Sequence, residues 1–316
     1  MFNKLSTKTL IILFAVLLII VAAFLFHDSK HGERSFRNEL VNIDTAKVTS
    51  INIYPKNTGH KLVKIFKEGN YWKVDIANNK TAYVPQQKVD EMFTELLKIK
   101  PLSVAALNKN KWKEYQVDDS SGTEVKVYEG GDNTLDITLG KFAFERPRNM
   151  STYVRVAGDN SVYKISGMPG FIFNQGANYF RDGRVINDNY SNWTKLSFAY
   201  PDDSSFVLEK KNKDWMIGAR KADSANTVNF LRSLSQLNNQ SFVDNFDQSA
   251  LSKATYTLTI NSSAKGGITV TSFISPSDTL INSSTNPDAY FNGNKTTLLK
   301  SIFVGKKHFF SKKKKK

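Results

Sequence analysis

Two segments, residues 69–99 and 212–237, share one pattern of hydrophobic and polar positions. Each begins with a short stretch that contains a tryptophan, continues through a polar loop and ends in an amphipathic helix. Apolar residues at helical spacing define one buried face in each helix. These faces comprise Met92, Phe93, Leu96 and Ile99 in the first segment, and Phe230, Leu231, Leu234 and Leu237 in the second. The repetition indicates that the chain contains one structural unit twice.

Alternating apolar and polar residues predict three strands before each helix. The predicted strands are residues 48–55, 61–66 and 71–74 in the first repeat, and 193–201, 206–210 and 214–217 in the second. Pro85 suits the first turn of the first helix, because its missing N–H would have no partner there. Ser224 is the expected N-cap of the second helix. Each repeat should therefore open with a β-meander that leads into a helix.

Hairpins are expected after each helix. Gly130-Gly131 mark the turn of a hairpin over residues 125–140, and Gly266-Gly267 mark one over residues 256–273, since glycine adopts the positive φ of tight turns. Second hairpins are predicted over residues 152–165 and 278–291, with a helical or irregular closing segment at 170–187. This order predicts an α+β fold, an N-terminal transmembrane helix followed by two tandem β-meander/helix/β-hairpin units with mostly antiparallel sheet.

The expected transmembrane helix is the uninterrupted apolar run at residues 10–26. As a helix it would span about 25 Å, close to the thickness of a bilayer core. The alternative is a signal peptide cleaved near Val21-Ala22-Ala23. The run is longer than the roughly 7–15 residues of a usual signal core, so a retained anchor is favoured.

The predicted organisation places a long body behind a short head, which is the layout of a signal anchor. We therefore expect a single-pass protein of the inner (cytoplasmic) membrane with its body in the periplasm, although basic residues flank the anchor almost evenly on both sides. The segments are a cytoplasmic head (1–9), the anchor (10–26), a juxtamembrane linker (27–45), repeats at 46–190 and 191–300, and a basic tail (301–316). Lys312 to Lys316, part of a net charge of +15, either contact anionic lipid or remain solvated.

The composition narrows the possible chemistry. The chain has no cysteine, which excludes disulfides, thiolate metal sites, cysteine nucleophiles and a lipid-modified cysteine. His27 and His31 have a helical metal-ligand spacing, but no third ligand accompanies them, so a solvated linker is favoured over a metal site. We therefore expect no metal and no cofactor.

Carboxylate pairs do not point to catalysis either. Asp118-Asp119 and Asp202-Asp203 lie in turn-like contexts, where aspartates accept backbone hydrogen bonds. Asp182 stands between Arg181 and Arg184, which would keep it ionised in a structural ion pair with a tight turn at Gly183. The protein is accordingly predicted not to be an enzyme.

Aromatic residues offer two candidate binding features. Trp72 and Trp215 occupy the same place in the repeated strand, which favours core anchors over a carbohydrate platform. The candidate ligand patch is basic and aromatic, and it consists of Phe142, Phe144, Arg146, Arg148 and Arg155. Such a patch suits phosphate, acidic polysaccharide or lipid, or it is a solvated hairpin tip. Nucleic acid is not an expected partner of an exported protein.

The order of these elements resembles a known family. The tryptophan strand, the helix "VDEMFTELLKI", the strand "LDITLGK", the hairpin "TYVRVAGDNSVYKI" and the closing "YFRDGRVI" are similar to the domain of unknown function 4340 family. The resemblance implies an N-terminal anchor and kinship to auxiliary components of ABC-type transporters linked to gliding motility, without established site residues. We therefore expect a docking or scaffold protein with a protein partner in the envelope. The alternative is binding of acidic polysaccharide or lipid through the patch.

Overall fold

The computed structural model describes residues 37–146, 149–246, 251, 253–274, 279–293 and 297–311, with positions 14, 16, 17, 19 and 21. The expected head, most of the anchor, His27, His31 and Lys312 to Lys316 lie outside these residues. Within the part that is described, no helix is long and apolar enough to cross a membrane. The chain groups into two compact units, which we call the first unit (residues 1–48 and 92–173) and the second unit (49–91 and 174–316).

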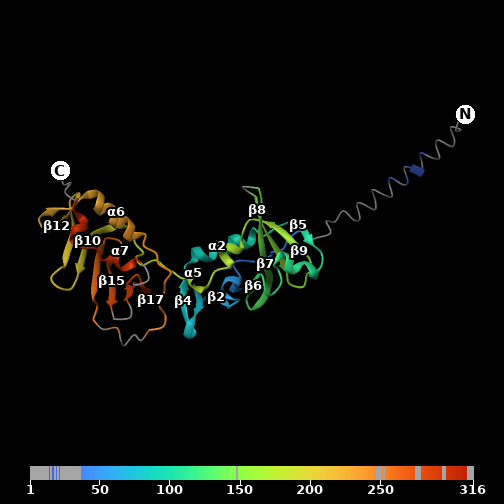
Figure 1. The fold of residues 1–316 in the computed structure, drawn as a ribbon, viewed down its shortest axis with the longest axis horizontal. Helices are drawn as coiled ribbons and strands as arrows, with labels where there is room; N and C mark the ends of the chain where they lie inside the picture. The colour runs from blue at the N-terminus through green and yellow to red at the C-terminus, as the bar shows by residue number, and fades with distance from the viewer. Residues whose placement is uncertain are drawn as a thin grey trace. The chain divides into compact units, whose positions relative to one another are not determined.

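The fold is α+β with mostly antiparallel sheet, as predicted (Figure 1). Nine strands form one sheet in the order β4-β3-β2-β1-β6-β7-β8-β9-β5. Their bounds are β1 Val48–Tyr54, β2 Val63–Glu68, β3 Tyr71–Ile76, β4 Lys80–Val84, β5 Pro101–Ala106, β6 Thr123–Glu129, β7 Asp132–Arg146, β8 Asn149–Val156 and β9 Val162–Ser166.

Eight strands form the second sheet in the order β13-β12-β11-β10-β14-β15-β16-β17. Their bounds are β10 Trp193–Ala199, β11 Phe206–Lys211, β12 Asp214–Ile217, β13 Arg220–Lys221, β14 Tyr256–Ser262, β15 Gly266–Ile274, β16 Thr279–Ser283 and β17 Asn286–Asn292. When β10 is aligned with β1, the eight strands of the second sheet correspond in order to β4-β3-β2-β1-β6-β7-β8-β9 of the first sheet. Strand β5 of the first sheet has no counterpart in this alignment.

Helices occupy equivalent places in the chain. Helix α2 (Gln86–Leu97) follows β4, and α6 (Ser224–Ser235) follows β13. The predicted faces are buried in both, apart from Leu237, which is partly buried and lies beyond the end of α6. The remaining helical segments are short: η1 Lys56–Thr58, η2 Ala77–Asn79, η3 Lys109–Lys111, α3 Trp112–Tyr115, α4 Gly170–Phe173, α5 Ala177–Phe180, η4 Tyr190–Asn192, α7 Leu298–Ile302 and η6 Lys306–Phe309.

Some details of the elements differ from the sequence predictions. The N-cap of α6 is Asp223, whose carboxylate accepts a hydrogen bond from the Asn226 N–H at 2.9 Å, and Ser224 is the first helical residue. Strands β4 and β13 lie in what the sequence predicts as loops, because they are short and polar. Gly266 pairs with Ser262, so the glycines open β15 and the turn lies before them.

The core of the second unit is unusually aromatic. Phe198 stacks on Phe206 with ring centroids 4.4 Å apart. The ring centroid of Phe309 lies within 6.1 Å of the centroids of both rings and 5.2 Å from that of Phe230. Aromatic pairs at these distances contribute beyond their buried area. Trp215 packs against the same core, in agreement with its interpretation as a structural anchor.

Most of the apolar residues within 301–311, a segment expected as the start of a basic tail, belong to this core or pack against it. Phe309 is fully buried, and its carbonyl accepts a hydrogen bond from the Asp223 N–H at 2.8 Å. The Val304 carbonyl accepts one from the Tyr200 hydroxyl at 2.8 Å. The apolar residues among the lysines decide this outcome, because burying a phenylalanine contributes about 2 kcal/mol or more.

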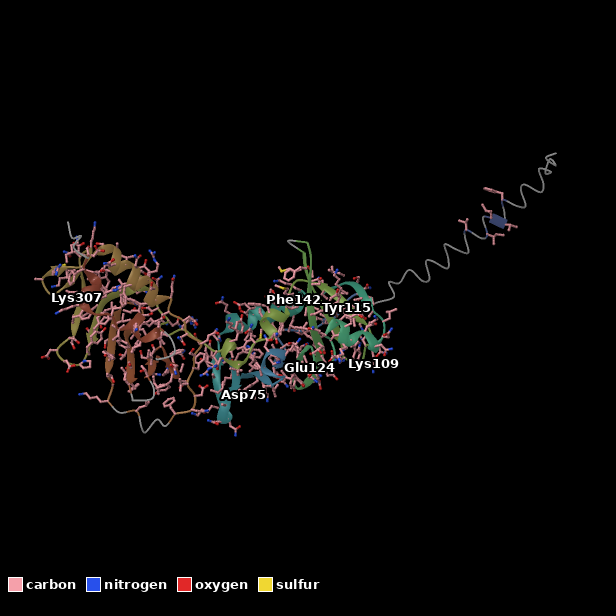
Figure 2. The ribbon with its side chains drawn as sticks, in the orientation of Figure 1. Asp75, Lys109, Tyr115, Glu124, Phe142 and Lys307 are labelled. Carbon is pink, nitrogen blue, oxygen red and sulfur yellow. The ribbon has the colours of Figure 1, made fainter. Side chains whose placement is uncertain are left out.

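We predict that Phe309→Ala lowers the free energy of unfolding by about 3–4 kcal/mol, because it empties a site among three other phenylalanines. Lys307, which is exposed (Figure 2), provides the control. Lys307→Ala should change the stability by less than about 0.5 kcal/mol. Urea denaturation followed by tryptophan fluorescence measures both, and equal effects would show that this segment is not part of the core.

Candidate functional site: an aromatic arm and a cleft at a strand edge

Strands β7 and β8 extend beyond their neighbours in the first unit. The pairing of β6 with β7 stops at Leu139, and the pairing of β9 with β8 stops at Ser151. The remaining residues, 141–146 of β7 and 149–150 of β8, form a two-stranded ribbon that we call the arm (Figure 1). A ribbon of two strands is only marginally stable in water by itself. Contact with another surface would therefore stabilise the arm.

One face of the arm is apolar and exposed. Phe144 and Met150 are directly opposite each other across the two strands, and Phe142 lies two residues before Phe144 on the same face. Phe142 is 60% exposed, Phe144 65% and Met150 39%. The two rings meet edge to face with centroids 5.5 Å apart. Apolar side chains gathered in this way mark interaction surfaces more often than isolated exposed ones do.

The structure brings together only part of the predicted ligand patch. Phe142 and Phe144 share the arm, while the side chain of Arg146 and all of Arg148 lie outside the described part of the chain. The cation that the structure places on the arm is Lys141, with its Nζ 5.1 Å from the Tyr115 ring centroid. Figure 2 labels Phe142 and Tyr115 in this region.

Arg155 lies away from the arm and has a structural role. Its Nε donates to the Val117 carbonyl at 2.8 Å, and its Nη2 donates to Asp119 at 2.6 Å and to Thr138 at 3.0 Å. The guanidinium carbon lies 4.2 Å from the centroid of the Trp112 ring. Because its side chain is only 11% exposed and its hydrogen bonds are internal, Arg155 secures a loop to the sheet.

The neighbouring Asp118 is also engaged locally. Its Oδ1 accepts hydrogen bonds from the Ser120 N–H at 3.1 Å, the Ser120 hydroxyl at 2.5 Å and the Ser121 hydroxyl at 3.1 Å. Burial raises the pKa of this carboxyl, but the hydrogen bonds outweigh it and the pKa is lowered overall. Asp118 therefore accepts hydrogen bonds within a turn, which is the role its sequence context indicates.

A cleft of about 620 Å³ lies within the second unit. One wall consists of residues 79–83, which contain most of the edge strand β4. The rest of the lining comes mainly from residues 242–244, 246 and 286–290. Arg181 and Asp182 also line it. Four aromatic residues contribute to its surface, namely Tyr83, Phe242, Phe246 and Tyr290. A volume of this size lies within the range of ordinary ligand sites.

Arg181 is a buried structural residue of this cleft. Its Nη1 and Nη2 donate to the two carboxylate oxygens of Asp244 at 2.8 and 2.9 Å, and Nη1 also donates to Asn178 at 3.1 Å. The guanidinium carbon lies 3.7 Å from the centroid of the Phe242 ring. Such a bidentate, stacked geometry suits arginine and leaves little capacity for a ligand.

Asp182 is paired with one of its two flanking arginines. Arg184 donates to its carboxylate through Nη2 at 2.6 Å and Nε at 2.9 Å, whereas Arg181 turns to Asp244. The predicted ion pair is thus present with a single arginine. Gly183 is required by a close approach, since a Cβ there would come within 2.5 Å of Asn238 Oδ1 and 2.7 Å of the Asn239 carbonyl.

Comparison with known proteins places the chain in a family. The sequence model of a domain of unknown function, DUF4340, matches residues 72–259, more than half of the chain. The chain belongs to the DUF4340 family. No curated protein and no solved structure matches it. In this DUF4340 protein the matched region runs from Trp72 on β3 to Thr259 on β14 and includes the whole arm.

The DUF4340 match also contains Arg181, Asp244 and one wall of the cleft, while residues 286–290 lie beyond it. Sequence reasoning missed this cleft, because its walls come from segments about 160 and 200 residues apart. Among the described residues, no group of three or more histidines or carboxylates is arranged to hold a metal ion. A second cavity of about 690 Å³ lies in the first unit between residues 37–42 and residues 133–136. The arm and the cleft combine exposed apolar side chains with strand backbone.

We predict that Arg181→Ala lowers the free energy of unfolding by about 3 kcal/mol or more, because it leaves the Asp244 carboxylate partly buried without its cation. Arg184→Ala is the matched control. Its side chain is 44% exposed and also pairs with an aspartate, so the loss should stay below about 1 kcal/mol. Equal losses in urea denaturation would contradict the assignment of Arg181 as the buried partner.

We also predict a pH-dependent effect of Asp118→Asn. A carboxyl whose pKa is lowered in the folded state stabilises the protein above its unfolded pKa of about 3.9, and this contribution is lost as the pH falls through the folded value. The variant should therefore be less stable than the wild type at pH 7, and the difference should shrink at about pH 3. Thermal denaturation at the two pH values tests this, and a constant difference would contradict it.

Proposed function

We propose that this DUF4340 protein is a non-enzymatic docking module, anchored in the inner membrane, with its body in the periplasm. The observation that supports docking is the arm, which presents Phe142, Phe144 and Met150 to solvent on one face of a two-stranded ribbon. Burying one such side chain contributes about 2 kcal/mol, so the three together supply a substantial part of a protein–protein affinity.

The apolar run at residues 10–26 supports the anchor. The five described positions within it are helical, and all of them are apolar and exposed: Phe14, Val16, Leu17, Ile19 and Val21. An exposed helix with no polar face is costly in water and favourable in lipid. The proposed anchor would hold the arm close to other proteins of the same membrane.

The shared strand order supports a duplicated origin for the two repeats. Eight strands and one helix recur in the same succession. Among the described residues, β5 has a place only in the first repeat, and α7 and η6 follow the last strand of the second. Among the described residues, β15 of the second repeat has nine residues, whereas β7 has fifteen. This difference suggests that the copies diverged and that the first acquired the docking role.

The proposed partner is an envelope protein, and the family resemblance favours a subunit of an ABC-type transporter. A second candidate is an acidic polysaccharide or lipid. It is favoured by the sequence between the two strands of the arm, where Arg146 and Arg148 flank Pro147. Arg155 does not contribute to such a site, because its guanidinium group is engaged internally.

The docking proposal is tested by co-purification of the full-length protein from detergent-solubilised membranes of its own host. Phe142→Ala with Phe144→Ala should reduce the transporter subunits recovered with the protein by about tenfold, since it removes both rings of the arm. Leu107, 69% exposed in the same unit, provides the control. Leu107→Ala should leave recovery within about twofold of the wild type.

Recovery that survives the double substitution would contradict docking through the arm. The second candidate predicts a different result, in which vesicles rich in anionic phospholipid or an acidic polysaccharide bind the protein. That binding should be abolished by Arg146→Ala with Arg148→Ala and should weaken as the salt concentration rises. Co-purification that is unaffected by the arginine substitutions would favour the protein partner.

A further inference from the structure

The outer strands of the two sheets are β4, β5, β13 and β17, and among the described residues three of them are protected against pairing with another chain. Strand β5 has register shifts at both ends of its pairing with β9. Strand β13 has two residues, both charged and exposed. Strand β17 is covered, because the Val243 N–H donates to the Tyr290 carbonyl and the Asn292 N–H to the Ser241 carbonyl, both at 2.8 Å. Irregularity, charge and coverage are the usual means of blocking a sheet edge.

The outer edge of β4 is regular, and one of its carbonyl groups accepts a hydrogen bond from a backbone N–H outside the sheet. The Asp182 N–H donates to the Tyr83 carbonyl at 3.3 Å. In antiparallel pairs, every second residue directs its N–H and C=O away from the partner strand. Tyr83 is therefore an outward-facing position, and Thr81, two residues earlier, is the next one. Within the described chain no backbone group pairs with this outer side of Thr81.

The free edge at Thr81 opens into the cleft. Thr81 and Tyr83 both line it, and Tyr83 is 45% exposed. Phe246 and Tyr290 also line it, with ring centroids 4.5 Å apart. The cleft thus combines an unpaired strand edge with aromatic surface for side chains that alternate along an added strand.

Most of the charged groups that line this cleft are engaged within the protein, with Asp288 as a further acidic residue of the lining. The Lys80 ammonium group donates to the Asp244 carbonyl at 3.3 Å. Arg181 is neutralised by Asp244, and Asp182 by Arg184. The ammonium group of Lys73 contacts Glu68. A ligand suited to this surface would therefore rely on main-chain hydrogen bonds and apolar contacts, and a peptide in an extended conformation provides both.

We propose that the cleft beside β4 binds an extended peptide, whose main chain pairs with the outer edge of β4 at Thr81. Its main chain would pair with the N–H and C=O of Thr81, and apolar side chains at alternate positions would contact Tyr83 and Tyr290. This site is separate from the arm, and it does not depend on the docking role proposed above.

Thr81→Pro tests the main-chain contact directly. Proline removes the outward N–H, and an edge strand tolerates proline at a position whose N–H faces away from its neighbour. The preceding residue is compatible, because Lys80 has φ −89° and ψ 160°. Thr81→Val is the matched control, since it changes the side chain and keeps the N–H.

The experiment selects binders from a phage-displayed library of random peptides of about ten residues, with the full-length protein in detergent as the target and Thr81→Pro as the counter-target. The selected peptides are then synthesised and their affinities measured by fluorescence anisotropy. Thr81→Pro should weaken them by about tenfold or more, and Thr81→Val by less than about twofold. Phe142→Ala with Phe144→Ala should leave these affinities unchanged.

A second measurement modifies the peptide and leaves the protein intact. Methylation of alternate backbone nitrogens removes the donors that would pair with β4, and one of the two alternating sets should weaken binding by about tenfold. The proposal is overturned if no peptide is enriched over the counter-target, if Thr81→Pro binds as tightly as the wild type, or if neither methylated set loses affinity. Loss of binding in the arm variant would also overturn it, because the peptides would then occupy the arm.

Discussion

Backbone hydrogen bonding at the margins of the two sheets is the constraint on which both candidate sites depend. Inside a sheet, each strand satisfies its N–H and C=O groups with neighbours on both sides. Two of the places where this pairing ends carry the candidate sites. The arm is where β7 and β8 continue past β6 and β9, and the cleft is where β4 has no neighbouring strand at its outer edge. The proposed binding surfaces are thus the parts of the sheets where a strand lacks a neighbouring strand.

The charged residues near these places mainly stabilise the protein itself. Arg181 is bound by Asp244 and stacked on Phe242, while Arg155 holds the loop that contains Val117 and Asp119. Buried arginines that donate to internal acceptors preserve local geometry and contribute little to recognition.

Much of the secondary structure could be predicted, because apolar residues at helical or alternating spacing mark the faces that become buried. Helices α2 and α6 and the strands of both meanders have this property. Strands β4 and β13 do not, since their residues are mostly polar and their place in the sheets comes from hairpin pairing with β3 and β12. Of the candidate patch, the aromatic residues share the arm, but the position of Arg155 depends on Trp112 and Val117, which no local pattern connects to it.

The sequence by itself determined the α+β class, the recurrence of a meander and a helix, and the apolar faces that form the core, because these follow from periodicity within short segments. Only the tertiary structure decided that Phe309 belongs to that core, that Arg181 binds Asp244 rather than Asp182, and that Thr81 faces a cleft. These outcomes depend on strand register and on which distant surfaces fit together. Such contacts join groups far apart in the chain, and no periodic pattern of polar and apolar residues records them.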